Sequence, residues 1–352
     1  MKGFDFMKRT LSLLLAIITL LSVAAAVPSA AATTEIAATA AQTSKAVPAI
    51  SALKMTEKGV QITWKAVSGV TRYRVFVKNA KGGWSGKANV NGTSYVDTTV
   101  KSGTSYTYTV RGIDKKGNFC TDYNRAGMTI SYVAAPNFNM KSKPLGLKVN
   151  WNPVKGAKRY RVFYKNRYGE WKKLADTDRA GYLFKGAQNG VKYTFTVRCL
   201  SNDGKKYISS YISAGKSLRY ADPKLSYTAK QKKAHDVVMS IIKQIPDNYS
   251  DFDKVCLAAD AASYYSSRAT YTDKDPDYAT PYGVFVKGVY TCAGSTRALG
   301  MILDYLGFDW KHINENQYTH QWCELTIDGK KVYADGQANL VGYGNHPALY
   351  TL

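Results

Sequence analysis

The sequence has few acidic residues, few cysteines and a single long apolar run. Among its 352 residues, 25 are Asp or Glu and 49 are Lys or Arg, which gives a net charge of +24 at neutral pH. Five cysteines are too few for a disulfide scaffold, and an odd number leaves at least one thiol without a partner in the chain. No Cys-x-x-Cys pair is present, which argues against a structural zinc site. No apolar stretch after residue 26 is long enough to span a bilayer, so we expect no transmembrane segment after the N-terminus is removed.

The apolar run stands near the N-terminus and has the form of an export signal. Lys2, Lys8 and Arg9 precede it at 11–26, and three alanines at 30–32 supply a cleavage site of small residues. The run is shorter than a bilayer-spanning helix, which argues against a membrane anchor. We therefore predict a signal peptide at 1–32, an Ala/Thr-rich leader at 33–46 and a secreted, extracellular protein that associates with the cell wall. No cysteine follows the run, and no apolar tail with basic residues ends the sequence, so we expect neither a lipid anchor nor covalent sorting to the wall.

Two copies of one module follow the leader. Arg-Tyr-Arg-Val-Phe at 72–76 recurs at 159–163, and Trp64 recurs as Trp151, both at an offset of 87 residues. The same offset holds for four further residues and their counterparts: Trp84 and Trp171, Gly103 and Gly190, Tyr106 and Tyr193, Gly117 and Gly204. A constant offset indicates a duplicated module, with copies at 47–133 and 134–219.

Each copy alternates apolar and polar residues with the period of a β-strand. Val60, Ile62 and Trp64 share one face of a predicted strand, and the second copy repeats the pattern. Short alternating strands between Gly, Asn and Ser turns favour an antiparallel β-sandwich. The placement of Trp64, Tyr73 and Tyr106 resembles fibronectin type III modules. This resemblance implies two all-β fibronectin type III-like sandwiches with a spacer or binding role, although neither copy has the paired cysteines of an immunoglobulin domain.

The positive charge is concentrated in these two copies. The net charge is +9 for 47–133, +15 for 134–219 and −2 for 220–352. A concentrated positive field attracts polyanions, so we expect residues 47–219 to bind a polyanionic cell-wall polymer or an acidic glycan. Nucleic acid fits the charge but not the export signal, so we expect no nucleic-acid partner. The alternative is that the lysines only keep the outward strand faces solvated.

The pattern changes after residue 222 and predicts a compact α+β domain at 222–352. Apolar residues recur with helical spacing in three segments: 229–245, 252–265 and 291–306, the last ended by Gly307. Strands are predicted at 321–327 and 331–334, with Asp328-Gly329 as the hairpin turn.

Three residues of this domain are candidates for catalysis. Cys292 stands at the start of a predicted helix, where backbone N–H groups and the helix dipole favour the thiolate. His320 begins one predicted strand and Asp335 ends the next, so adjacent strands would bring them together. His320 would exchange a proton with Cys292, and Asp335 would fix the imidazole tautomer. Gly294 is expected to let the backbone approach a bound acyl group.

The segments around these residues resemble the transglutaminase-like core. They are Cys-Ala-Gly at 292–294, His-Gln-Trp at 320–322 and Ile-Asp-Gly-Lys-Lys-Val-Tyr-Ala-Asp at 327–335. That family uses Cys, His and Asp in this order in a papain-like arrangement, and its members are peptidases, amidases or protein cross-linkers, some without activity. The resemblance implies that Cys292 is the nucleophile, His320 the base and Asp335 the orienting residue.

The chain departs from the family pattern at three positions. Gln321 stands where the family has a small residue, Gly336 where proline is frequent, and Ser295 where an aromatic residue is often found. These departures concern the shape of the substrate site more than its chemistry. The side-chain donor of the oxyanion hole is not identifiable from the sequence.

Other interpretations of the same residues remain open. Cys292 could be a buried structural thiol, a zinc ligand with Cys323, or half of a Cys292–Cys323 disulfide. His312 and His346 are competing bases. By alternation, Cys323 faces away from His320 and belongs to the core or its rim. The remaining cysteines are expected to be buried at 199 and 256 and exposed at 120.

The sequence therefore predicts a secreted, cysteine-dependent acyl-transfer enzyme. It would act on proteins or cell-wall peptides as a peptidase, an amidase or a transglutaminase, tethered by its basic repeats and without a cofactor or metal. The alternative is a non-catalytic surface adhesin or wall-binding protein with an inactive transglutaminase-like domain.

Overall fold

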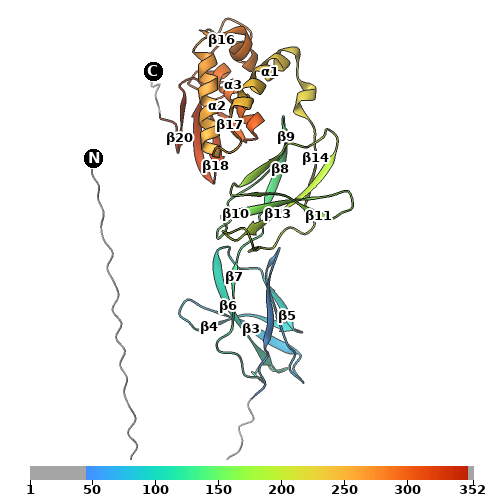
Figure 1. Ribbon diagram of the computed structural model, residues 1–352. Coiled ribbons are helices and arrows are strands. Elements are labelled where there is room, and N and C mark those ends of the chain that lie inside the picture. The colour runs from blue at the N-terminus through green and yellow to red at the C-terminus, as the bar shows by residue number, and fades with distance from the viewer. Residues whose placement is uncertain (1–44, 348–352) are drawn as a thin grey trace, which may run out of the picture. The chain divides into compact units, whose positions relative to one another are not determined.

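The computed structural model describes residues 45–347 (Figure 1), so the signal peptide predicted at 1–32 lies outside the described residues. No helix within residues 45–347 is long and apolar enough to cross a membrane.

The first copy of the module is a sandwich of two antiparallel sheets, as predicted. One sheet has the order β1-β2-β5 and the other the order β4-β3-β6-β7. The strand bounds are β1 Ile50–Thr56, β2 Gly59–Trp64, β3 Arg72–Lys78, β4 Trp84–Asn91, β5 Ser94–Asp97, β6 Thr104–Ile113 and β7 Met128–Tyr132. The alternating apolar residues predicted to share a face fill the core between the sheets: Val60, Ile62, Trp64, Tyr73 and Val75.

The second copy repeats this topology strand for strand. Its sheets have the orders β12-β9-β8 and β11-β10-β13-β14. The strand bounds are β8 Phe138–Lys143, β9 Gly146–Trp151, β10 Arg159–Lys165, β11 Trp171–Thr177, β12 Gly181–Phe184, β13 Lys192–Leu200 and β14 Lys216–Arg219. The core Trp–Tyr pair is also repeated, with ring centroids 5.5 Å apart for Trp64 and Tyr73 and 5.2 Å apart for Trp151 and Tyr160.

Each sandwich contains the same tyrosine-to-backbone bond at one corner. The hydroxyl of Tyr106 accepts a hydrogen bond from the backbone N–H of Lys101 at 2.7 Å, and the hydroxyl of Tyr193 accepts one from Gln188 at 3.0 Å. A tyrosine near the start of a strand that binds the backbone a few residues upstream is a hallmark of Greek-key sandwiches. The bond explains why Tyr106 and Tyr193 occur at the constant offset.

The C-terminal region combines three α-helices and two short helices with a four-stranded antiparallel sheet of order β17-β18-β19-β20 (Figure 1). Its helices are η1 Pro223–Ser226, α1 Ala229–Gln244, α2 Asp251–Ser266, η2 Gly283–Lys287 and α3 Cys292–Leu306. Its strands are β15 Thr270–Tyr271, β16 Val289–Tyr290, β17 Trp310–Ile313, β18 Trp322–Ile327, β19 Lys330–Asp335 and β20 Leu340–Tyr343. Short β15 and β16 pair in parallel, a feature that the sequence analysis did not predict.

The predicted helices and strands of this region lie within a residue or two of the observed ones. Helix α1 begins with a capping box of Thr228 and Gln231, and α2 begins at Ser250, whose side chain accepts from the backbone of Asp253. Helix α3 ends at Gly307, whose φ of 83° lies in the left-handed region that favours glycine. The Asp328-Gly329 turn has φ values of 50° and 77°, as a two-residue hairpin turn requires.

Helix α3 forms the centre of the C-terminal core. It is apolar on most of its surface and contacts α1, α2, β17 and β18. Its central residues Leu299, Ile302 and Leu303 are fully buried. A helix buried on nearly all sides has little freedom to shift, so its first residue, Cys292, is held at a fixed place.

Candidate active site

The structure brings Cys292, His320 and Asp335 together. Cys292 is the first residue of α3, His320 lies two residues before the start of β18, and Asp335 ends β19. The imidazole Nε2 of His320 lies 2.6 Å from Oδ2 of Asp335. His320 also hydrogen-bonds to the thiol of Cys292. Because Nε2 is engaged by the carboxylate, Nδ1 is the nitrogen left for the sulfur. Cys292 is partly exposed, so the buried structural thiol considered above is not what the structure shows.

The carboxylate of Asp335 is fully buried and held on both oxygens. Oδ1 accepts backbone hydrogen bonds from Gln337 at 2.9 Å and Ala338 at 3.0 Å, while Oδ2 faces His320. Burial alone would raise the pKa of Asp335, but the bonds from His320 and from these backbone groups hold it below its ordinary value. A fixed, ionised carboxylate is suited to orient an imidazole.

The same contacts favour the protonated form of His320. Burial acts to lower the pKa of its imidazole, but the hydrogen bonds with Asp335 and Cys292 outweigh burial and raise the pKa to about 9. An imidazole with a raised pKa takes up the proton of the neighbouring thiol more readily, and the imidazolium that results stabilises the thiolate.

Helix α3 differs from α1 and α2 in having no side chain as its N-cap. Thr291 occupies the cap position without a side-chain hydrogen bond, although Thr228 and Ser250 cap the other two helices. The hydroxyl of Tyr271 lies beside the backbone N–H and the thiol of Cys292. Burial, followed by the charge of Cys292, raises the pKa of Tyr271, so this hydroxyl stays protonated and can donate.

Short β15 places Tyr271 at this position. In the parallel ladder, Tyr271 is paired with Tyr290, two residues before Cys292, and the two rings meet edge to face at 5.2 Å. The ring remains 58% exposed, so it lines the open side of the site. The sequence analysis missed Tyr271 because no motif marks it, and only the pairing of two two-residue strands brings it to the cysteine.

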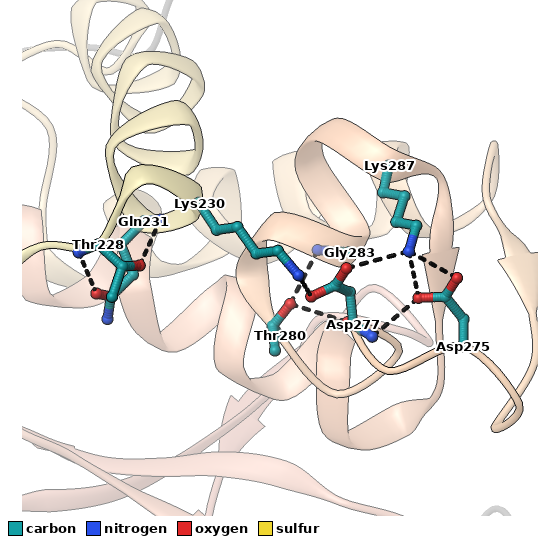
Figure 2. A network of polar contacts seen from close by, with 8 residues as sticks. All are labelled: Thr228, Lys230, Gln231, Asp275, Asp277, Thr280, Gly283 and Lys287. Atoms are coloured by element: carbon teal, nitrogen blue, oxygen red, sulfur yellow. Dashed lines mark hydrogen bonds and ion pairs between the residues drawn. The ribbon is translucent and has the colours of Figure 1, made fainter.

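A network of ion pairs fixes the segment before Cys292 (Figure 2). Asp277 is 5% exposed and receives Lys230 of α1 at 2.6 Å and Lys287 at 3.1 Å. Lys287 also bridges to Asp275 at 2.7 Å. The hydroxyl of Thr280 joins the backbones of Asp277 and Gly283 in the same network. The lysines hold the pKa of Asp277 below its ordinary value, so both members of each pair are charged at neutral pH.

This fixed segment packs directly on the start of α3. The backbone N–H of Thr291 donates to the carbonyl of Tyr278 at 3.1 Å. A Cβ at Gly294 would lie 2.2 Å from the same carbonyl oxygen. The prediction for Gly294 was therefore wrong in its reason, because the missing side chain admits the protein's own backbone rather than a bound acyl group.

The two competing bases lie elsewhere. Nε2 of His312 is 2.6 Å from the side-chain oxygen of Gln321, and burial lowers the pKa of His312. His346 lies beside His320, with ring centroids 5.8 Å apart, and its Nε2 is 3.1 Å from the same Oδ2 of Asp335, while its ring stacks on Trp322 at 4.5 Å. Asp335 thus has two imidazole neighbours, and the sequence analysis did not foresee the second.

Three ligand atoms of this cluster are close enough to hold a metal ion. They belong to His320, Asp335 and His346 and lie within 4.8 Å of one another. Two imidazole nitrogens and a carboxylate oxygen suit a transition metal. Such an ion would replace the contact between His320 and Asp335, so metal binding and proton transfer through His320 exclude one another.

The other cysteines show which thiols are inert. Cys323 is fully buried, donates to the carbonyl of Thr296 and has a pKa that burial raises well above its ordinary value. All five cysteines are free, so no Cys292–Cys323 disulfide is present. Cys199 is buried and Cys120 exposed, as predicted, whereas Cys256 is only half-buried rather than part of the core.

The residues that depart from the family pattern have structural partners. Ser295 is fully buried and its hydroxyl lies 2.8 Å from that of Ser266. A Cβ at Gly336 would lie 2.9 Å from Ala262 of α2, so glycine allows the helix to approach. Gln321 is nearly buried and bonds to the backbone of Gln317. These residues stabilise the surroundings of the site without facing Cys292.

Comparison with known proteins gives partial matches. No protein-family model matches the chain. Exoglucanase B of Cellulomonas fimi is 29% identical over 199 residues, which are 50% of this chain and 17% of that protein. Amylopullulanase of Thermoanaerobacterium saccharolyticum is 32% identical over 81 residues, which are 22% of this chain and 6% of that protein. The chain therefore spans less than a fifth of the length of these curated relatives.

Solved fibronectin type III structures also match parts of the chain. The FN1–FN3 domains of chicken CNTN1 are 15% identical, with a TM-score of 0.23, over 51% of this chain and 66% of that one. The central fibronectin-III array of RIM-binding protein is 18% identical, with a TM-score of 0.20, over 50% of this chain and 69% of that one. The sheet orders and the tyrosine corners described above make the two sandwiches fibronectin type III-like repeats.

Proposed function

We propose that the C-terminal region is a cysteine-dependent acyl-transfer enzyme of transglutaminase-like type that acts on proteins or cell-wall peptides. The observation that supports this proposal most strongly is the position of His320, which hydrogen-bonds to Asp335 on one side and to Cys292 on the other. The order of the three residues, with the cysteine at a helix N-terminus, the histidine just before one strand and the aspartate at the end of the next, also agrees with the resemblance noted from the sequence.

The proposed first step forms a thioester. Cys292 transfers its proton to His320, and the thiolate attacks the carbonyl carbon of an amide. The new C–S bond forms as the C–N bond breaks, and the imidazolium gives its proton to the departing nitrogen. Asp335 keeps the imidazole in the orientation that both transfers need.

The negative oxygen of the tetrahedral intermediate needs donors near Cys292. The backbone N–H of Cys292 is one, and the hydroxyl of Tyr271 beside it is the second. A substrate oxygen at this position would accept from the backbone N–H of Cys292 and from the hydroxyl of Tyr271 beside it.

The second step releases the acyl group to an acceptor. Water gives a peptidase or amidase, and a lysine amine gives a cross-linked product, with His320 removing the acceptor's proton in both cases. We favour hydrolysis, because residues 45–347 show no second amine-binding feature. The basic repeats would hold a secreted enzyme at an anionic surface such as the cell wall.

A substrate assay with three variants tests the proposal. Wild type, Cys292→Ala and the control Cys120→Ala would be incubated with casein and with cell-wall peptides, with and without a labelled primary amine. We expect new peptide termini or released ammonia with wild type and Cys120→Ala, and none with Cys292→Ala. Label that enters the protein would identify transamidation.

The same assay addresses the non-catalytic alternative. If folded wild type produces no termini, ammonia or labelled product from either substrate, the acyl-transfer proposal fails. The chain would then be a wall-binding protein or adhesin.

A further inference from the structure

A cluster of arginine and aromatic side chains lies on the outward face of the first sandwich. The guanidinium of Arg111 lies 4.2 Å from the ring centroid of Phe119 and 5.5 Å from that of Tyr123. Phe76 packs beside Phe119 with ring centroids 6.0 Å apart. Arg74 is paired with Arg111 across β3 and β6, next to the buried pair of Val75 and Val110.

The second sandwich contains the same cluster. The guanidinium of Arg198 lies 3.8 Å from the ring centroid of Tyr207 and 5.1 Å from that of Tyr211. Phe163 packs beside Tyr207 at 6.3 Å, and Arg161 is paired with Arg198 across β10 and β13. The arginines and phenylalanines keep the offset of 87, while the loop aromatics are shifted by one more residue. The cluster is thus reproduced in space even where the loop sequence is not.

Two features of the cluster oppose folding. The first is that like charges stand directly opposite each other, an arrangement that destabilises a sheet and that only the second sandwich offsets, through Asp176. The second is that large aromatic rings are left in solvent, with Phe119 38% exposed and Tyr207 42% exposed. A feature that opposes stability and is present twice is best explained by binding.

The guanidinium groups retain hydrogen-bonding capacity. Within residues 45–347, Arg111 donates only through Nε, to the carbonyl of Thr121, and Arg198 only through Nη2, to the carbonyl of Ser209. Nε of Arg198 is buried and has no partner there. An arginine presents five N–H donors in a planar fork, so each cluster can still engage a carboxylate.

The two copies differ in one neighbour. In the second sandwich, Asp176 is paired with Arg161 and accepts from it at 2.6 and 2.8 Å. In the first sandwich the corresponding neighbour of Arg74 is Asn89, which carries no charge. The first cluster therefore has two arginines available to an anion and the second has one.

We propose that each cluster binds an acidic polysaccharide, with the exposed aromatic ring against the sugar ring and the arginine on its carboxylate. The ring supplies a flat apolar surface for the C–H face of a sugar, and the guanidinium supplies charge-assisted hydrogen bonds. A polymer that repeats ring and charge can occupy both clusters of one chain, which raises its avidity. This inference specifies the partner of the basic repeats in the proposed function.

Binding assays with three polymers test the choice of ligand. Full-length Cys292→Ala protein, which removes any turnover, would be titrated with polygalacturonate, with the neutral polysaccharide pullulan, and with polyglutamate. We expect polygalacturonate to bind at least about tenfold more tightly than either of the others at equal ionic strength. Equal affinity for polyglutamate would show that the clusters bind any anionic polymer through charge alone. Equal affinity for pullulan would show that the arginines do not contribute to binding.

Matched variants test the place of binding. We expect Arg111→Gln with Arg198→Gln to weaken polygalacturonate binding about tenfold or more, and the control Lys54→Gln with Lys192→Gln, which removes the same charge from exposed sites elsewhere, to weaken it less than about twofold. Asn89→Asp places a carboxylate beside Arg74, as Asp176 stands beside Arg161 in the second sandwich, and hardly changes the side-chain volume. We expect this variant to bind polygalacturonate several-fold more weakly, because Arg74 would then be paired within the protein.

Thermal unfolding would show that the variants are folded. The inference is overturned if the lysine control weakens binding as much as the arginine variant, or if Asn89→Asp leaves binding unchanged. Neither result would affect the acyl-transfer proposal, because the assay uses a protein without the nucleophile.

Discussion

The fibronectin type III-like sandwiches and the C-terminal region differ in how their residues are combined. In a sandwich, the core residues follow from alternation along each strand and recur at the constant offset in the second copy, and charge lies outward while apolar residues lie inward. In the C-terminal region, the groups at the site come from β15, α3, the segment before β18 and the end of β19. A repeated module can therefore be read from periodicity, whereas the site depends on the packing of segments far apart in the chain.

The two regions also hold their charges differently. The repeats carry nearly all the net positive charge, and many of their arginines stack on exposed rings. The C-terminal region is close to neutral and pairs charges at buried carboxylates such as Asp277 and Asp335. Exposed charge can serve a partner, while buried paired charge positions chemistry.

The largest expected effect is the loss of activity in the C-terminal region when the proposed base, His320, is removed. We expect His320→Ala to lower kcat/KM by about 10³- to 10⁴-fold, because the proposed mechanism assigns the proton of Cys292 to this imidazole. Polysaccharide binding by the repeats should not change. Hydrolysis assays and polygalacturonate titrations on the same preparation would measure both, and substantial remaining turnover would show that another group is the base.

A core substitution in the first sandwich should destabilise that sandwich and leave the activity of the C-terminal region intact. Trp64 is 2% exposed and packs on Tyr73, so we expect Trp64→Ala to lower the free energy of unfolding of that sandwich by about 3–5 kcal/mol. Denaturant unfolding followed by tryptophan fluorescence measures the loss. Turnover of a small soluble peptide should persist, and a parallel loss of turnover would show that the two regions are not independent.

The pair of His320 and Asp335 should make both activity and stability depend on pH. Asp335→Asn removes the carboxylate that supports the raised pKa of His320, so the alkaline limb of activity should move to lower pH and kcat should fall by about 10²-fold. If the alkaline limb of the pH–activity profile stays at the same pH in Asp335→Asn, the imidazole of His320 does not control that limb.

The stability effect has a defined sign. The pKa of His320 is raised from 6.5 to about 9, so its pairing stabilises the fold fully below pH 6.5 and this contribution is lost as pH rises through about 9. The pKa of Asp335 is lowered from 3.8, so its contribution is present above that pH and is lost on further acidification. Thermal unfolding at pH 6, 8 and about 10 should show a loss at high pH that Asp335→Asn does not share.

The smallest expected effect concerns the second oxyanion donor. Tyr271→Phe removes the hydroxyl but keeps the ring against Tyr290, so we expect kcat to fall about tenfold with little change in KM. Tyr168→Phe is the control, because it removes a hydroxyl from an exposed tyrosine of the second sandwich and should retain kcat. Alkylation of Cys292 by a small reagent should be as fast in Tyr271→Phe as in wild type. A rise in KM with kcat unchanged would instead assign Tyr271 to substrate binding.

Much of the fold could be predicted because it depends on local patterns. Alternation located the sandwich strands, and caps, Gly307 and the Asp328-Gly329 turn fixed the ends of the C-terminal elements. Cys292, His320 and Asp335 were found through sequence motifs and the adjacency of two antiparallel strands. Their roles remain proposals.

The missed residues all depend on contacts without a local signal. Tyr271 reaches Cys292 through a two-residue parallel pairing, and His346 reaches Asp335 from a loop. The role of Gly294 was misjudged because the chain that approaches it, at Tyr278, lies in an irregular segment fixed by ion pairs. Packing of irregular segments is set by long-range contacts, which periodicity does not report.

The rate of alkylation of each cysteine tests the central claim most directly. Wild type and His320→Ala would be treated with iodoacetamide across a pH series, and modification at Cys292 and at exposed Cys120 would be followed by mass spectrometry. The account predicts that Cys292 reacts at least about tenfold faster than Cys120 at neutral pH and that this advantage disappears in His320→Ala. Equal rates at the two cysteines in the folded wild type would contradict it.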